Sequence, residues 1–174
     1  MQLTNPSGTK TINIKENEEL HIKLEDFEPG SREFTLQVNL EGDNAECHIS
    51  GRCQTIGKDN KTWTVVQTFR GTGQEGSIDI RGTAEDQSRI ECNAQGILEQ
   101  CSHQATANIS ERVILYDQAK SKLLPVLTVK TDDVAGASHG ATVAPVEPEK
   151  ILYLQGKGIH KKEAETMIKE GFLQ

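Results

Sequence analysis

The sequence predicts an all-β domain followed by a short helical segment. From about residue 10 to residue 130, apolar and polar residues alternate with a period of two, as a strand with one buried face requires. Turns rich in glycine and asparagine separate these runs, and the last 30 or so residues change to helical spacing. We therefore divide the chain into a β domain over residues 1–146 and a helical segment over residues 147–174.

Each alternating run has the length of one short strand. The clearest runs are residues 11–15, 20–24, 34–40, 63–69, 77–81 and 89–94. The turn signals between them are residues 28–31, 41–44, 57–60, 71–76 and 81–83. Glycine and asparagine in these segments supply the positive φ angles that tight corners need. We expect about ten strands of ordinary length.

Alternation alone does not distinguish an antiparallel sandwich from a solenoid. A parallel β-helix stacks short strands coil upon coil, so that each inward side chain packs on its equivalent one coil away. No fixed repeat period is visible in this sequence. The pattern by itself therefore favours an antiparallel sandwich.

Composition and charge narrow the class of protein. The 174 residues are 34% hydrophobic and 26% charged, which suits one soluble domain with a core of its own. A net charge of −7 disfavours nucleic acid and anionic membrane surfaces as main partners. The chain starts without the features of a secretory signal and has no apolar run long enough to span a membrane, so we expect a cytoplasmic protein.

The four cysteines do not form a familiar metal-binding pattern. Cys47, Cys53, Cys92 and Cys101 lack the tight spacing of zinc ribbons or common cluster-binding loops. In a reducing compartment they stay thiols, and free cysteine is usually buried. Cys101 and His103 are two residues apart, which would place thiol and imidazole on the same face of a strand.

The C-terminal segment predicts two helices. Pro145 and Pro148 end the β region, and Pro148 suits the first turn of a helix that Gly156 and Gly158 end. The second helix is expected from about residue 161 to residue 170, with Gly171 as its C-terminal cap. Such a pair can cover the open end of a β domain, and it can also dock in a partner's groove.

From about residue 104 to the end, the chain resembles the SufB/SufD proteins, scaffold subunits of an iron–sulfur cluster assembly machine. The matching segments follow the family's order and approximate spacing at residues 120–125, 132–134, 138–143, 153–154, 158–159 and 163–164. Residues 69–71 and 104–108 resemble the preceding coils. The first 60 residues carry no specific match. The chain is much shorter than a typical SufB or SufD subunit, so we expect a short form without the family's usual N-terminal extension.

The resemblance implies a right-handed parallel β-helix capped by helices, which reverses the preference for a sandwich. It implies a scaffold that is not itself an enzyme and that pairs through its β-helix core, including residues 132–142, with a SufB/SufD paralogue or with a second copy as a homodimer. It also implies a SufC-like ATPase docked on residues 147–172. The apolar residues expected at that contact are Ile151, Leu152, Leu154, Met167, Ile168 and Phe172.

His139 is the residue that the resemblance singles out. It lies in a Ser-His-Gly-Ala-Thr motif that SufD-like proteins place at the subunit interface, where the nascent cluster is built. A neutral imidazole can ligate iron. Ala119 and Ala137 stand where relatives carry cysteines. The expected substitutes for holding a transient iron–sulfur cluster are Cys92, Cys101 and His103, provided that the fold brings them near His139. The alternative is a corner residue whose imidazole binds backbone groups.

Two other classes of protein stay open. One is a small-ligand or protein-binding β domain without cluster chemistry, for which a sugar ligand is disfavoured by one tryptophan and two tyrosines. The other is an enzymatic β-helix with an exposed cluster of Asp79, Arg81, Arg89 and Glu91. The glycine-rich segment 71–76 lacks the Gly-Lys-Ser/Thr ending of a phosphate-binding loop.

Overall fold

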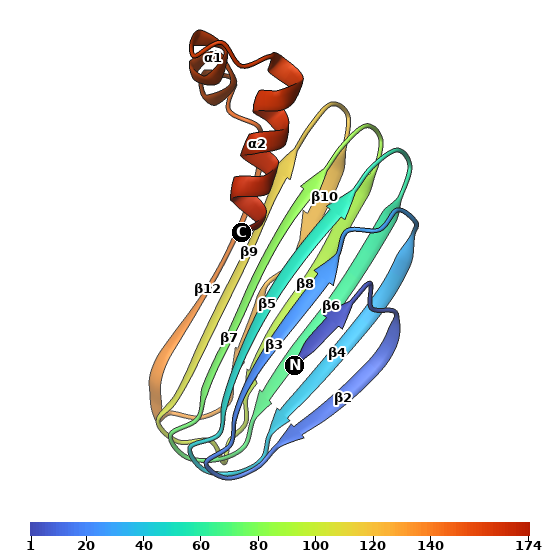
Figure 1. Cartoon of the computed structure of the whole chain (residues 1–174). Coiled ribbons are helices and arrows are strands. Elements are labelled where there is room, and N and C mark those ends of the chain that lie inside the picture. Colours follow the sequence, from blue (N-terminus) through green and yellow to red (C-terminus); the bar gives the residue numbers. More distant parts are fainter.

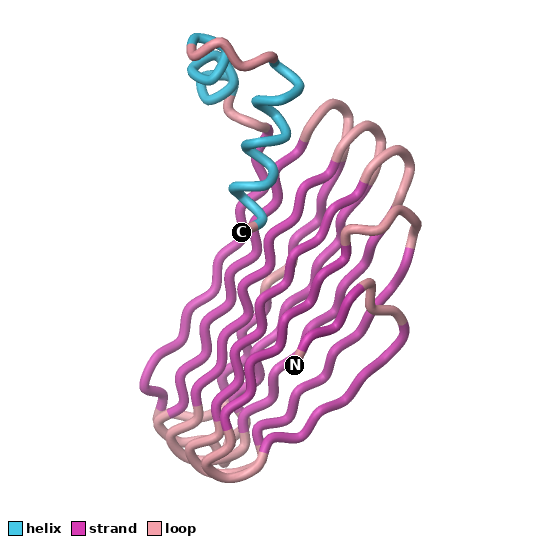
Figure 2. The backbone as a smooth tube through the Cα atoms, in the orientation of Figure 1, coloured by secondary structure: helices cyan, strands magenta, loops and turns pink.

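The computed structural model describes residues 1–174 and shows a parallel β-helix with two helices at its C-terminal end (Figure 1). All strand pairs are parallel, so the expectation of an antiparallel sandwich from the alternation pattern is wrong and the β-helix is confirmed. The strands form two sheets that lie against each other along the whole length of the β domain (Figure 2). Strands that follow each other in the chain mostly alternate between the sheets, and each coil contributes to both.

We call the two sheets A and B. Sheet A runs in the order β1 (Gln2–Thr4), β3 (Glu19–Asp26), β5 (Glu46–Thr55), β7 (Glu75–Ala84), β9 (Ala105–Leu115) and β12 (Val134–Pro145). Sheet B runs in the order β10 (Lys120–Leu123), β8 (Arg89–Leu98), β6 (Asn60–Phe69), β4 (Arg32–Leu40) and β2 (Gly8–Ile14), and β11 (Val126–Val129) also pairs with β8. The six alternating runs predicted from the sequence all fall on these strands.

The coils repeat, but their length varies, with 26 residues from Gly8 to Phe34 and 31 residues from Glu75 to Thr106, so no fixed period is visible in the sequence. His48 and Ser77 are register partners 29 residues apart, and the spacing between other stacked positions stays close to this value. Residues with positive φ mark one corner at each turn and stack along the solenoid: Asn17, Asn44, Gly73 and Gln104. Asparagine, glycine and glutamine all occupy this corner, and the coils differ in length. The sequence therefore shows no repeated motif at a fixed spacing.

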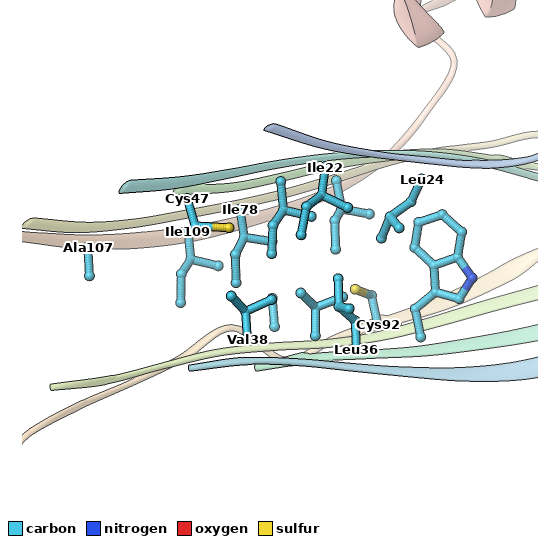
Figure 3. Packing of buried hydrophobic residues seen from close by; sticks show 14 of the residues in the cluster. Ile22, Leu24, Leu36, Val38, Cys47, Ile78, Cys92, Ala107 and Ile109 are labelled. Atoms are coloured by element: carbon cyan, nitrogen blue, oxygen red, sulfur yellow. The ribbon is translucent and has the colours of Figure 1, made fainter. Parts of the chain in front are cut away.

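The core lies between the two sheets and is built from stacked inward side chains. Ile22, Ile49, Ile78 and Ile109 are successive register partners in sheet A and are all buried. Figure 3 shows Ile22, Ile78 and Ile109 extending from one sheet toward Leu36, Val38 and Cys92 of the other. Stacking one branched side chain on its equivalent in the next coil fills the interior without large aromatic residues.

One buried ion pair interrupts this apolar interior. The Lys61 side chain is fully buried, and its Nζ lies 2.7 Å from Asp26 Oδ1. The same nitrogen donates to the backbone oxygens of Asp26, Glu28 and Gln54 at 2.7–3.0 Å. A buried ammonium is tolerated only when oxygens replace its water shell. Lys61 thereby ties the end of β3 to the start of β6.

The two helices are α1 (Pro148–Gly156) and α2 (Lys161–Leu173). The predicted first helix is confirmed, but α2 continues through Gly171, so the prediction of a cap there is wrong. Figure 1 shows α2 lying along sheet A while α1 stands beyond the end of the β-helix. Ala164 of α2 is fully buried, and Lys169 pairs with Glu85 of the segment after β7. No helix is long and apolar enough to cross a membrane.

Candidate functional site

The last coil of the β-helix is open on one side and carries the predicted site. β12 pairs only with β9, and most of its side chains are exposed. His139 is the register partner of Ile109, so it occupies the position that isoleucine fills in each earlier coil. Its ring is exposed, and Nδ1 lies 3.2 Å from the Pro125 carbonyl oxygen. The contact with a backbone oxygen is the one that the alternative expected, but His139 lies in the middle of β12 and not at a corner of the coil. Nε2 stays available to a ligand.

Glu111 is a buried carboxyl group that the sequence reasoning missed. It is fully buried in β9, at the position that Leu24 and Ile80 fill in earlier coils. Glu111 Oε1 accepts a hydrogen bond of 3.0 Å from the Ala94 backbone N–H, while Oε2 is buried without a hydrogen bond. Burial raises the pKa of this carboxyl. The sequence could have revealed Glu111, because it is a charged residue at one of the alternate positions of residues 105–113 that are otherwise apolar.

The Cys92 thiol lies beside Glu111, inside the same part of the core. Burial raises the pKa of the Cys92 thiol well above its usual value, and the neighbouring Glu111 carboxylate raises it further. The two side chains come from opposite sheets, β8 and β9, and meet one coil below the open end. The structure therefore places a thiol and a carboxyl group together where the sequence predicted only the thiol.

The other predicted ligands lie elsewhere. Cys101 is exposed, and it and His103 lie in the connection between β8 and β9 rather than on a strand, because the chain turns there. His103 Nδ1 lies 3.4 Å from Asp133 Oδ2. No group of three or more histidine, cysteine, aspartate or glutamate side chains is close enough to hold a metal ion. The expected set of His139, Cys92, Cys101 and His103 is thus not assembled within one chain.

Neither the two remaining thiols nor the four charged residues of the predicted enzymatic cluster form a site. Cys47 and Cys53 are buried in sheet A, and burial raises their pKa values to about 11 and about 12. Asp79 and Arg81 lie on sheet A, whereas Arg89 and Glu91 pair with each other on sheet B. Since the two sheets face opposite directions, these four residues do not form one site.

The helical pair presents apolar side chains to solvent. Among the six residues predicted at the ATPase contact, Leu152 and Met167 are exposed, Leu154, Ile168 and Phe172 are half-buried, and Ile151 is buried. Tyr153, which the prediction omitted, is also exposed. A groove of about 650 Å³ lies between the helices and the end of the β-helix, lined in part by Tyr116, Val146, Ile151 and Leu152.

A family model described as the SUF system FeS cluster assembly, SufBD core domain, matches residues 7–172. The chain belongs to the SufBD core family. This match covers both the β-helix and the helical pair. The sequence resemblance was strongest from about residue 104 to the end, and the family assignment now extends to the residues before it.

Named relatives agree with the family assignment. The chain is 33% identical to the iron–sulfur cluster assembly protein SufD of Bacillus subtilis over 137 residues, which is 78% of this chain and 31% of that protein. It is 20% identical over 166 residues to SufD of Plasmodium falciparum, which is 94% of this chain and 11% of that protein. A 44-residue segment is 46% identical to SufD of Escherichia coli, covering 25% and 10% of the two chains. This SufBD core thus spans less than a third of these relatives.

Proposed function

We propose that this chain is a non-catalytic scaffold component of iron–sulfur cluster assembly. The observation that carries the proposal is the SufBD core match over residues 7–172, together with an open last coil that holds His139. The scaffold has three parts: a pairing edge, a docking surface for an ATPase and a site for the iron that is its cargo.

The pairing edge is β12. One side of this 12-residue strand has no strand partner, and an unpaired edge is a template for pairing with another chain. Val143 is exposed on it. A second copy, or a SufB/SufD paralogue, would extend sheet A across the open end, and identical chains most often pair about a two-fold axis. Pairing would also bring two copies of His139 toward one another.

The docking surface is formed by the exposed apolar side chains Leu152, Tyr153 and Met167 on α1 and α2. Amphipathic helices bind partners through such anchors. Ile151 and Ala164 are buried and hold the two helices in place beneath this surface. We assign a SufC-like ATPase to it, as the resemblance to the family implies.

The iron site would be completed only in the pair. His139 offers an imidazole at the surface, and Cys92 with Glu111 offers a thiol and a carboxyl group one coil below. Thiolate, imidazole and carboxylate are all ligands for iron. Because Ala119 and Ala137 stand where relatives carry thiols, we assign the role of those thiols to the buried pair.

The test is anaerobic co-purification of the full chain with the SufC-like ATPase of the same organism, with iron and acid-labile sulfide assayed in the complex. Leu152→Glu should abolish the complex, whereas Ile56→Glu, an exposed apolar residue at a corner of the solenoid, should leave it intact. His139→Ala should keep the complex and lower its iron and sulfide. No complex with the unaltered chain would overturn the docking assignment.

The second candidate is a protein-binding β domain of the same family without cluster chemistry. The absence of an assembled ligand set in one chain favours it. A stable complex that contains no iron or sulfide, with or without His139, would establish this reading in place of the first.

A further inference from the structure

Three arginines form a row on the outer face of sheet A. Arg52, Arg81 and Arg112 are register partners on β5, β7 and β9. Neighbouring strands are about 4.8 Å apart, and like charges directly opposite each other destabilise a sheet. The chain as a whole carries a net charge of −7, so this row does not belong to a generally basic surface. The three positive charges repel one another, so negative charge nearby stabilises the row.

A single carboxylate holds the row in place. Asp79 Oδ1 accepts from Arg112 Nη2 at 2.7 Å, and Asp79 Oδ2 accepts from Arg52 Nη2 at 3.1 Å. Arg81 Nε lies 3.3 Å from the same Oδ2. Arg52 is 8% exposed and also donates to two backbone oxygens. The three guanidinium groups share this one carboxylate. Glu25, the register partner of Arg52 on β3, is already paired with Lys23, so the row keeps a net positive charge.

Several donors of Arg81 and Arg112 have no partner within the chain. Arg81 Nη1 donates to the Phe172 carbonyl oxygen of α2 at 3.2 Å, but Arg81 Nη2 makes no hydrogen bond. Arg112 Nε is buried without a partner, and Arg112 bonds only through Nη2. Neither Arg52 nor Arg112 bonds to α2, so anchoring of this helix accounts for one of the three arginines. Ser110, the register partner of Asp79, adds a hydroxyl group beside the row.

We propose that Arg81 and Arg112 bind the phosphate group of a small molecule, with Asp79 and Arg52 positioning them. A phosphate dianion carries the two negative charges that the row lacks, whereas a single carboxylate carries one. The guanidinium fork matches the oxygen spacing of phosphate and binds it through paired hydrogen bonds. The side chain of Arg112 is 42% exposed, which gives the ligand access from solvent. This site is distinct from the open coil and from the surface of α1.

The test is calorimetric titration of the full chain with pyrophosphate at about 0.15 M salt, where exposed charges are screened beyond about 8 Å. We expect saturable binding that Arg112→Gln weakens about tenfold or more, because the substitution removes a charge-assisted hydrogen bond to the phosphate. Arg89→Gln is the matched control. It removes the same charge from sheet B, and it should bind as the unaltered chain does. Thermal unfolding of both variants checks that they are folded.

Two further titrations identify the source of the phosphate. Tighter binding of an adenine nucleotide than of pyrophosphate would assign the site to an organic phosphate, and the reverse would assign it to a free inorganic one. Either result supports the proposal. No saturable binding by the unaltered chain, an equal loss in both variants, or equal affinity for a hexaglutamate peptide would overturn it.

Discussion

Lys61 and Glu111 are both ionisable side chains buried inside the same β-helix, yet their surroundings differ. Lys61 lies among the middle coils, and its ammonium group contacts four oxygens. Glu111 lies one coil below the open end, where one of its oxygens has a partner and the other has none. Asp26 Oδ2, beside Lys61, is also buried without a hydrogen bond, but Asp26 is paired with the cations Lys61 and Arg32. Glu111 has no ion pair, so the free-energy cost of burying its carboxyl group is offset less completely.

The isoleucine stack of sheet A also differs between the closed coils and the open end. In the closed coils the isoleucine stack is covered on both sides, so only apolar side chains fit. At β12 the stack has no further coil, and His139 can replace isoleucine without losing buried contacts. The comparison predicts large effects on stability in the closed coils and small ones at the open end.

The largest effect is expected from Lys61→Ala. The substitution leaves the buried Asp26 carboxylate with only the more distant Arg32, whose Nη1 lies 3.5 Å from Oδ1, and it should lower the free energy of unfolding by about 3–5 kcal/mol. Urea unfolding followed by circular dichroism measures this. The exposed Lys58→Ala is the control and should change stability by less than about 0.5 kcal/mol. Similar losses of stability in the two variants would show that the buried Lys61–Asp26 pair does not stabilise the fold.

Ile78→Ala should lower the free energy of unfolding by about 3 kcal/mol, since it opens a cavity in the middle of the isoleucine stack. His139→Ala, at the end of the same stack, should change it by less than about 0.5 kcal/mol. The same unfolding measurement applies to both. A loss at His139 as large as that at Ile78 would mean that the last coil is as closed as the others.

Glu111→Gln tests the partly unpaired carboxyl through its pH dependence. Burial raises the folded-state pKa above the ordinary value of 4.5, so the folded chain binds the proton more tightly than the unfolded chain. As pH rises from about 4.5 through the raised pKa, the unaltered chain should lose stability relative to Glu111→Gln, by about 1.4 kcal/mol for each unit of difference. Exposed Glu33→Gln should follow the unaltered chain. A constant difference across pH would contradict the assignment.

Thiol labelling should show the smallest difference between the coils, and it reports on single residues. At pH 8 a thiol reagent should modify Cys101 rapidly, because it alone is exposed, and the other three cysteines slowly. Burial raises the pKa of Cys47 to about 11 and of Cys53 to about 12, which suppresses their thiolates. Burial and the neighbouring Glu111 also raise the pKa of Cys92 well above its usual value, yet we expect Cys92 to react before Cys47, because the coils near the open end fluctuate more than the closed coils. Mass spectrometry of timed samples orders the sites, and equal rates would contradict that difference.

The sequence by itself determined the strands, the helices and the family. Strict alternation over runs such as 34–40 requires one buried face, and no later folding step changes which residues are apolar. The prolines at 145 and 148 mark the end of the strands for a covalent reason, the missing N–H. The Ser-His-Gly-Ala-Thr motif pointed to His139, and the comparisons confirmed the family that the motif suggested.

Only the tertiary structure decided how the strands pair and which charges meet. Alternation with a period of two is the same in an antiparallel sandwich and in a β-helix, so parallel stacking follows from contacts about 29 residues apart. The meeting of Cys92 with Glu111 and the row from Arg52 to Arg112 depend on that register. Long-range register is set by the packing of whole coils, which no local pattern of residues specifies.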